Sequence, residues 1–221
     1  MTRLYIVRHC ETMGNHLKVF QGNSDFEVSP VGKKQIDALG ERFRGIDVNV
    51  IYSSPLARAK KTAAAIAQIK GLEIITDNDL REIHGGIIEG KHLNDIFENH
   101  RQLEDAWNLT PQNFAPENGE SMRSVYARVF AAVQRIIREN KGQNIVTVSH
   151  GAAIRCLMCW LLYGDIERLR EVPWCDNTAV TLVEFDEQLK PEIKFTNSVD
   201  HLSEELLPVT NKIAAWGTEG K

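Results

Sequence analysis

The chain has 221 residues, of which 43% are hydrophobic and 25% charged, with a net charge of -4 at pH 7. This composition is typical of a globular protein with one sizeable core. The slight acidic excess disfavours broad binding of nucleic acid or an anionic membrane, so we expect any anion site to be local. We also expect a cytoplasmic protein with reduced thiols, because four scattered cysteines make no disulfide framework and no leader or membrane-spanning run is evident.

Strands and helices alternate along the first third of the chain. Apolar β-prone runs predict the strands, while Ser-Pro pairs mark helix starts and glycines mark helix stops. In chain order, the predicted elements are a strand at 4–7, a polar loop up to residue 28, a helix from Ser29-Pro30 to Gly45, a strand at 47–52, a helix from Ser54-Pro55 through residues 57–69 to Gly71, and a strand at 72–76.

Residues 77–117 have poor periodicity, with one short predicted helix at 93–100 and two prolines, Pro111 and Pro116, that interrupt the remainder. We interpret this segment as a small inserted cap.

The elements after the cap return to the earlier pattern. They are a long helix at 120–141, a buried strand at 144–149, an apolar helix at 151–163, strands at 178–185 and 192–196, and a frayed end from Thr218. This alternation predicts an α/β fold: a doubly wound, mostly parallel sheet with helices on both faces, formed by residues 1–221 as a single domain.

Three basic positions follow three of the predicted strands. Arg8-His9 follows the first strand, Arg58 lies in the first turn of the helix after the second, and His150-Gly151 ends the strand at 144–149. Ligands bind beyond the carboxyl ends of the strands in such sheets, so we expect these groups to meet there. Arg58 sits unfavourably at the positive end of a helix, so either an anion offsets its charge or water screens it at the surface.

These residues suit phosphoryl transfer. Two arginines can hold phosphate oxygens, the helix start at Gly151 can offer backbone donors, and a neutral imidazole nitrogen can attack phosphorus in line. The sequence has no recognisable metal-ligand motif, so we expect no metal and no other cofactor. Glu82 is the first candidate for the proton donor, with Asp79 and His84 weaker, although an isolated loop glutamate is more often a solvated carboxylate.

Several separate segments, in a consistent order, carry a resemblance to a known family. They are Arg8-His9-Cys10-Glu11-Thr12, Asn15, Phe20-Gln21-Gly22, Ser29-Pro30-Val31-Gly32, Ser53-Ser54-Pro55-Leu56-Ala57-Arg58 and Val148-Ser149-His150-Gly151. With them, the chain resembles the histidine phosphatase superfamily of phosphoglycerate-mutase-like proteins from residue 4 to about 202.

The resemblance implies a role for each matching residue. His9 becomes the nucleophile, Glu82 the proton donor, and Arg8, Arg58 and His150 the groups that hold the phosphoryl group. It implies further substrate contacts from Asn15, Gln21 and the adjacent Gly22.

Cys10 departs from the family pattern, which has glycine at this position. If the backbone there needs a positive φ, a cysteine strains the loop, and its thiol could also be open to oxidation. The alternative is an ordinary backbone with a small side chain pointing away from the site.

Three functions agree with the sequence. The first is a phosphomonoesterase acting on a small phosphorylated metabolite, the second a cofactor-dependent phosphoglycerate mutase, and the third a catalytically weak protein that binds phosphorylated ligands, motivated only by Cys10. Residues 92–116 are mixed to acidic, which offers little to a second anionic group of a bisphosphorylated substrate. Together with Gln21 and residues 116–121, this favours the phosphatase branch.

Overall fold

The structure is a computed structural model that describes residues 1–207 and contains a six-stranded sheet. The strands are β1 (Thr2–Arg8), β2 (Val50–Ser53), β3 (Ile74–Thr76), β4 (Asn144–Ser149), β5 (Val180–Phe185) and β6 (Pro191–Ser198). Their order across the sheet is β3-β2-β4-β1-β5-β6. The pairs β1–β4, β2–β4 and β2–β3 are parallel, whereas β5 pairs antiparallel with β1 and β6. The prediction of a mostly parallel α/β sheet is therefore confirmed.

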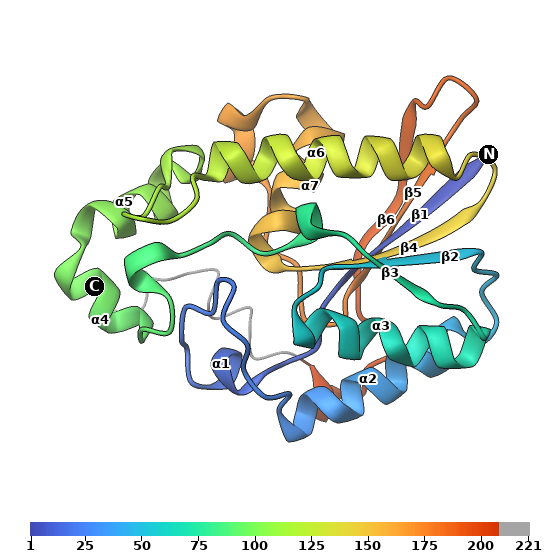
Figure 1. The fold of residues 1–221 in the computed structure, drawn as a ribbon, viewed down its shortest axis with the longest axis horizontal. Helices are drawn as coiled ribbons and strands as arrows, with labels where there is room; N and C mark the ends of the chain where they lie inside the picture. The colour runs from blue at the N-terminus through green and yellow to red at the C-terminus, as the bar shows by residue number, and fades with distance from the viewer. Residues whose placement is uncertain (208–221) are drawn as a thin grey trace.

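Helices cover both faces of this sheet (Figure 1). Helices α2 (Pro30–Phe43) and α3 (Ala57–Lys70) pack on one face, and α6 (Met122–Glu139) and α7 (Gly151–Tyr163) on the other. Strand β1 shows how one sequence serves two cores, since side chains alternate across a strand. Leu4 and Ile6 belong to the core beneath α6 and α7, while Tyr5 and Val7 belong to the core beneath α2 and α3.

The signals for helix ends are only partly those that the sequence suggested. Ser29 caps α2 by accepting a hydrogen bond from the backbone N–H of Gly32, and Gly71 ends α3 with a φ of 66°. Ser54, however, does not cap α3, which begins at Ala57 after the N-cap residue Leu56. The hydroxyl of Ser54 is instead bonded to His150, which puts it in the candidate site.

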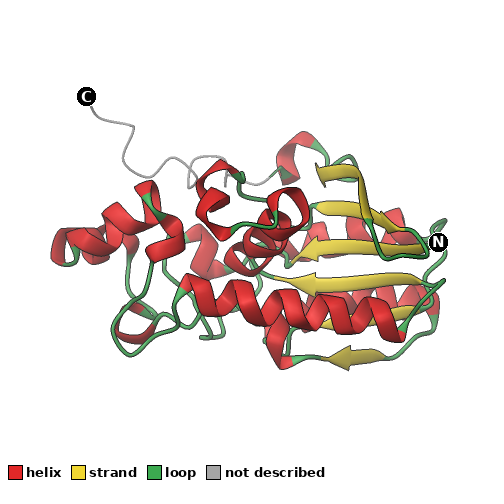
Figure 2. Cartoon of the chain, turned by 90° about the horizontal axis from the view of Figure 1, so that it is seen from above, coloured by secondary structure: helices red, strands yellow, loops and turns green. Residues whose placement is uncertain are grey.

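The segment predicted as a cap is more helical than the sequence indicated. It contains η1 (Asn78–Leu80), η2 (Gly86–Ile88), α4 (Leu93–Asn99), α5 (Arg101–Leu109) and η3 (Pro111–Asn113). Helix α5 was not predicted. Figures 1 and 2 show α4 and α5 at one end of the molecule, beyond the end of the sheet.

Other differences concern element boundaries. Strand β3 begins at Ile74 rather than at residue 72, because Leu72 is still hydrogen-bonded to the last turn of α3. Strand β2 begins at Val50, and β6 extends over Pro191–Ser198. Short helices α1 (Met13–His16), η4 (Ile166–Glu171) and η5 (Glu204–Leu206) complete the described chain. The fraying expected from Thr218 falls outside the described residues, and within residues 1–207 no helix has the length and apolar character needed to span a membrane.

Candidate active site

A cavity lies at the carboxyl ends of the central strands, where the sequence analysis expected a ligand. It brings together most of the candidate site residues. The lining residues are Arg8, His9, Gly14, Asn15, Lys18, Val19, Phe20, Gln21, Gly22, Arg58, Glu82, Ile83, Leu93, Trp107, Gly151 and Trp174. Of the alternative proton donors, neither Asp79 nor His84 is among them.

His9 directly follows β1 and is 3% exposed. Its ring Nδ1 lies 2.7 Å from the backbone oxygen of Cys10. A carbonyl oxygen can only accept, so Nδ1 carries the proton and Nε2 has a free lone pair. Burial, together with the charges of Arg58 and Arg8, holds the pKa of His9 well below its ordinary value. The ring is therefore a neutral imidazole whose Nε2 lone pair is free.

Arg58 is almost fully buried, at 1% exposure, so the interpretation of a screened surface charge is wrong. Its two terminal nitrogens donate to the backbone oxygens of Ser24 (2.8 Å) and Gly22 (2.7 Å). The start of α3 is also covered by Asp25, whose carboxylate accepts from the N–H of Ala57 at 3.0 Å. Part of the anionic charge expected at this helix end thus comes from the protein itself.

Three buried nitrogens around His9 have no hydrogen-bond partner: Nε of Arg8, Nε of Arg58 and Nδ1 of His150. Arg8 is otherwise held by a bond from Nη1 to the backbone oxygen of Cys175. Leaving a buried polar group unpaired costs about 1–3 kcal/mol, and more when the group is charged. A bound anion would supply the missing acceptors.

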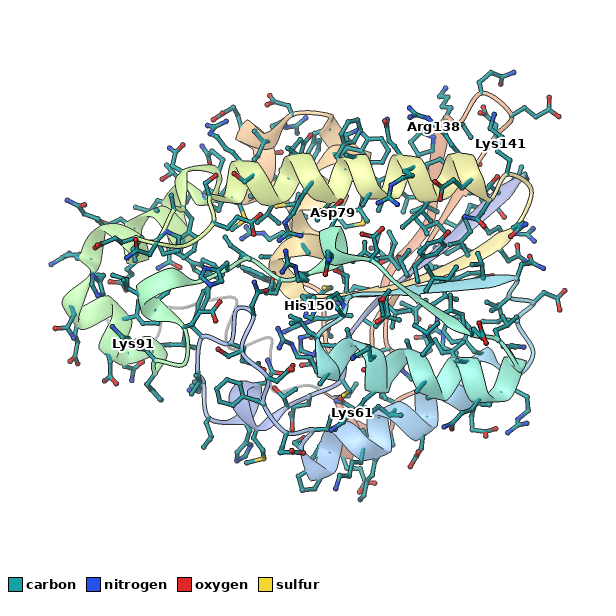
Figure 3. All side chains as sticks on the ribbon, in the orientation of Figure 1. Lys61, Asp79, Lys91, Arg138, Lys141 and His150 are labelled. Carbon is teal, nitrogen blue, oxygen red and sulfur yellow. The ribbon has the colours of Figure 1, made fainter. Side chains whose placement is uncertain are left out.

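His150 is buried beside His9 and is not among the residues that line the cavity. It follows β4 near the middle of the molecule (Figure 3), is fully buried, and its ring centre is 5.1 Å from that of His9. Its Nε2 is 2.7 Å from the hydroxyl of Ser54. If the hydroxyl of Ser54 donates to Nε2, the proton of a neutral His150 lies on the unpaired Nδ1.

Glu82 is not the solvated loop carboxylate that its sequence context suggested. Its carboxylate accepts from the N–H groups of Ala152 (3.1 Å) and Ala153 (3.2 Å), in the first turn of α7, and from Ile83 (2.9 Å). The backbone donors expected to face a ligand at this helix start are therefore directed at Glu82. The contact holds the carboxyl at the cavity wall.

Glu89 organises the loop that binds Arg58, a role that position in the sequence did not reveal. Its carboxylate accepts from the N–H of Asn23 (2.8 Å), the N–H of Gly85 (2.9 Å) and the hydroxyl of Ser24 (2.9 Å). Gly22 has a φ of 50°, and a Cβ there would lie 2.3 Å from the carboxylate of Glu89. Glycine is thus required for the loop to pass this close.

Asn15 and Gln21 are tied to each other through Thr12. The side-chain oxygen of Asn15 accepts from the N–H of Thr12 (3.1 Å), and that of Gln21 accepts from the Thr12 hydroxyl (2.8 Å). Both residues also line the cavity.

The outer wall of the cavity is aromatic. Trp107 of α5 stacks on Trp174 with ring centres 5.1 Å apart and an interplanar angle of 22°, and Phe20 meets Trp107 edge-on at 5.9 Å. Trp107 was missed because α5 was missed. The spacing of Leu103, Ala106 and Trp107, which pack against the core, is the helical signal that could have found it.

Cys10 has an ordinary backbone conformation and a buried side chain. It is absent from the residues with positive φ, its N–H donates to Thr62 at 3.0 Å, and its side chain is fully buried. Burial raises the pKa of its thiol to about 11, so the reactive thiolate is disfavoured. The interpretation of an unstrained backbone agrees with this geometry.

Comparison with known proteins places this site in a family. The sequence profile of the histidine phosphatase superfamily (branch 1) matches residues 4–198. The chain belongs to this superfamily. Phosphoserine phosphatase 1 of Hydrogenobacter thermophilus is 32% identical over 204 residues, which cover 92% of this chain and 96% of that protein.

The names of other proteins similar to this histidine phosphatase include both a phosphoglycerate mutase and a phosphatase. Probable phosphoglycerate mutase GpmB of Klebsiella pneumoniae is 35% identical over 167 residues, covering 73% of this chain and 75% of that protein. YhfR of Bacillus stearothermophilus has a TM-score of 0.87 at 30% identity, over 92% of this chain and 100% of that one. The mycobacterial glucosyl-3-phosphoglycerate phosphatase has a TM-score of 0.82 at 27% identity, over 89% and 99%.

Proposed function

We propose that this histidine phosphatase is a metal-independent phosphomonoesterase that acts on small phosphorylated metabolites through a phosphohistidine on His9. The observation that carries the proposal is the set of three unpaired buried nitrogens, on Arg8, Arg58 and His150, around an uncharged imidazole. A phosphoryl group would pair these donors and lie in front of Nε2 of His9.

The reaction would proceed in two steps. First, the lone pair of Nε2 forms a bond to phosphorus, the ester P–O bond breaks, and the carboxyl of Glu82 gives its proton to the leaving oxygen. Then a water oxygen attacks phosphorus, the carboxylate of Glu82 takes the water proton, and the N–P bond breaks to restore His9. In this scheme Asn15, Gln21, Gly22 and Gly151 line the site beside the phosphoryl group.

A phosphatase is favoured over a mutase by the outer part of the cavity. Beyond the residues around the phosphoryl group, the lining is largely apolar, with Phe20, Leu93, Trp107 and Trp174, and Lys18 as its further cation among the described residues. A second phosphate of a bisphosphorylated substrate would have few partners there. The hypothesis of a catalytically weak binding protein rested only on Cys10. Since Cys10 has no positive φ and does not line the cavity, it gives no support to that hypothesis.

The remaining expectations are also part of the proposal. Residues 1–221 would act as one domain, with residues 77–117 as a cap over the site. The four cysteines are free thiols, which suits the reducing cytoplasm. The slight acidic excess disfavours nucleic acid as a partner.

The test is a screen of phosphorylated metabolites in metal-free buffer that records both inorganic phosphate release and isomer exchange. A phosphatase releases phosphate without a bisphosphorylated primer. Isomer exchange that needs such a primer, with little phosphate released, would identify a mutase instead, and tight binding of vanadate without turnover would identify a binding protein.

A further inference from the structure

Arg128, on the helix α6, binds the segment that carries Glu82 with every donor that it has. Nη1 donates to the backbone oxygens of Asp79 (2.7 Å) and Arg81 (2.8 Å), and Nη2 donates to that of Glu82 (3.1 Å). Nε and Nη2 also donate to the two carboxylate oxygens of Glu120, at 2.7 Å and 2.8 Å. A guanidinium has five N–H groups, so none remains for a substrate.

The segment held in this way has little regular structure of its own. After the single turn of η1, Arg81 is extended, with φ of -65° and ψ of 160°. Figure 3 labels Asp79 on this segment, below α6. Besides Arg128, the hydroxyl of Ser149 donates to the backbone oxygen of Leu80 at 2.7 Å. Together with the buried side chains of Leu80 and Ile83, these contacts hold the backbone at Glu82.

Glu120 completes the arrangement. Its carboxylate pairs with Arg128 where the two side chains are 21% and 16% exposed, and its backbone N–H donates to the oxygen of His84 at 2.8 Å. The ion pair holds the plane of the guanidinium. The guanidinium in turn holds the orientation of the three backbone carbonyl groups to which it donates.

From this geometry we propose that Arg128 is a positioning residue that places the carboxyl of Glu82 for proton transfer. The inference rests on the acid role of Glu82 in the proposed function. Arg128 anchors the backbone of Glu82 while the start of α7 anchors its carboxylate, so the side chain is held from both ends. A displaced acid loses its effect even when the fold is intact, because proton transfer needs hydrogen-bond distance to the leaving oxygen.

The leaving group provides the readout. An alkoxide leaving from an alkyl phosphate needs the proton of Glu82, whereas para-nitrophenolate, a weak base, leaves without much help. A defect in acid placement therefore slows the first group of substrates selectively. A general loss of structure slows both.

The experiment compares the rates of phosphoenzyme formation on glycerol 2-phosphate and para-nitrophenyl phosphate for Arg128→Met, Glu82→Gln and the double variant. We expect Arg128→Met to lower the rate of phosphoenzyme formation from the alkyl ester roughly tenfold or more beyond its effect on the rate from the aryl ester. This lies within the range of rate enhancement that general acids supply. In the Glu82→Gln background, the same substitution should add almost nothing for the alkyl ester, because the acid that it places is gone.

Arg135→Met is the matched control. Arg135 lies on the same helix and approaches the same segment, but it is bonded to the carboxylate of Asp77 (2.8 Å) and not to the backbone near Glu82. It should leave the ratio of the two rates unchanged. Glu120→Gln weakens the ion pair but keeps the guanidinium of Arg128, so it should give a smaller selective loss. It replaces Arg128→Met as the test variant if a thermal melt shows that Arg128→Met is not folded.

The outcomes separate the two claims. Equal losses on both esters in Arg128→Met and Glu120→Gln, or the same selective loss in Arg135→Met, would overturn the positioning role while the acid role stands. An absence of selectivity in Glu82→Gln itself would remove the acid role from the proposed function, and the role of Arg128 with it.

Discussion

Two neighbouring imidazoles, those of His9 and His150, are held uncharged at the centre of this protein. Burial is the main cause of the lowered pKa of each ring, and the arginines add to it. A neutral His9 keeps the lone pair of Nε2 available below pH 6.5, where a free histidine would be protonated. The environment that keeps the two rings uncharged therefore has a cost in stability.

The sign of that cost follows from linkage. The unfolded chain protonates these histidines below about pH 6.5 while the folded chain does not, so the free energy of unfolding falls as the pH decreases from there. Each buried histidine contributes on the order of 1.4 kcal/mol per pH unit in that range. Urea denaturation of His9→Gln in phosphate-free buffer at pH 6.5 and 5.5 should show a shallower loss than the unsubstituted protein. His16→Gln, at an exposed histidine, should not, and equal slopes in all three proteins would contradict the account.

Arg58 gives a second prediction at this scale. Its planar guanidinium binds two backbone carbonyls and still leaves Nε for a phosphoryl oxygen, which the single ammonium of lysine cannot reproduce. Arg58→Lys should therefore lower kcat/KM by on the order of a hundredfold or more and weaken vanadate binding, as measured by steady-state kinetics and inhibition. Lys61→Arg, on the exposed side of the same helix, is the control; near-normal kinetics of Arg58→Lys would mean that Arg58 has no part in the site.

At the scale of elements, the loops around the site depend on close backbone contacts. Gly86 has a φ of 54°, and a Cβ there would lie 2.1 Å from the backbone oxygen of Glu117, in the stretch that leads to α6. The strain of the left-handed region alone is about 1–2 kcal/mol, and the clash adds to it.

Gly86→Ala should therefore lower the free energy of unfolding by at least about 1–2 kcal/mol, and activity with it. Gly45→Ala, where nothing lies within 4 Å of the added Cβ, should be close to neutral in the same urea titration. Equal stability of the two variants would mean that the contact at Gly86 is not maintained in solution.

The sequence predicted the elements that have clear local signals and missed those that depend on neighbours. The alternation of apolar runs found β1, β4 and α6, and the position of Arg8, His9 and Arg58 relative to their strands located the cavity. Helices α4 and α5 meet at His100, which offers α5 no side-chain cap, so no capping signal marked a second helix start and only the apolar spacing within α5 indicated it.

The contacts that hold Glu82 were equally hidden. Arg128 lies 46 residues beyond Glu82, and the first turn of α7 lies 70 residues beyond it. Their side chains and backbone groups meet only through the packing of α6 and α7 on the sheet. Local pattern could name Glu82 as a candidate but could not show that it is held in place.

At the scale of the whole molecule, the sheet brings the residues of the site together from distant parts of the chain. Among residues 1–207, no group of three or more His, Cys, Asp or Glu side chains is arranged to bind a metal ion. Prolonged treatment with a chelator, followed by assay in metal-free buffer, should therefore leave phosphate release unchanged. Loss of activity that one divalent cation restores, and others do not, would overturn the proposed chemistry.

Three adjacent parallel strands, β2, β4 and β1, lead to the residues around the proposed phosphoryl group. Strand β1 delivers Arg8 and His9, β2 leads to Arg58, and β4 ends at His150, so the phosphoryl group would lie where the parallel strands converge. Trp107 and Glu82, both within residues 77–117, and Trp174, between η4 and β5, also line the cavity. The proposed chemistry begins at Nε2 of His9, at the end of β1.

The most direct test is therefore to trap the phosphoenzyme. When the protein is mixed with a phosphate monoester and quenched in alkali within milliseconds, mass spectrometry should find an acid-labile phosphoryl group on His9, formed no more slowly than turnover. His9→Ala should form none and release no phosphate, because no neighbouring group can replace the attacking nitrogen. Phosphorylation of that variant at an unchanged rate, or turnover by the unsubstituted protein with no phosphohistidine at His9, would contradict the account.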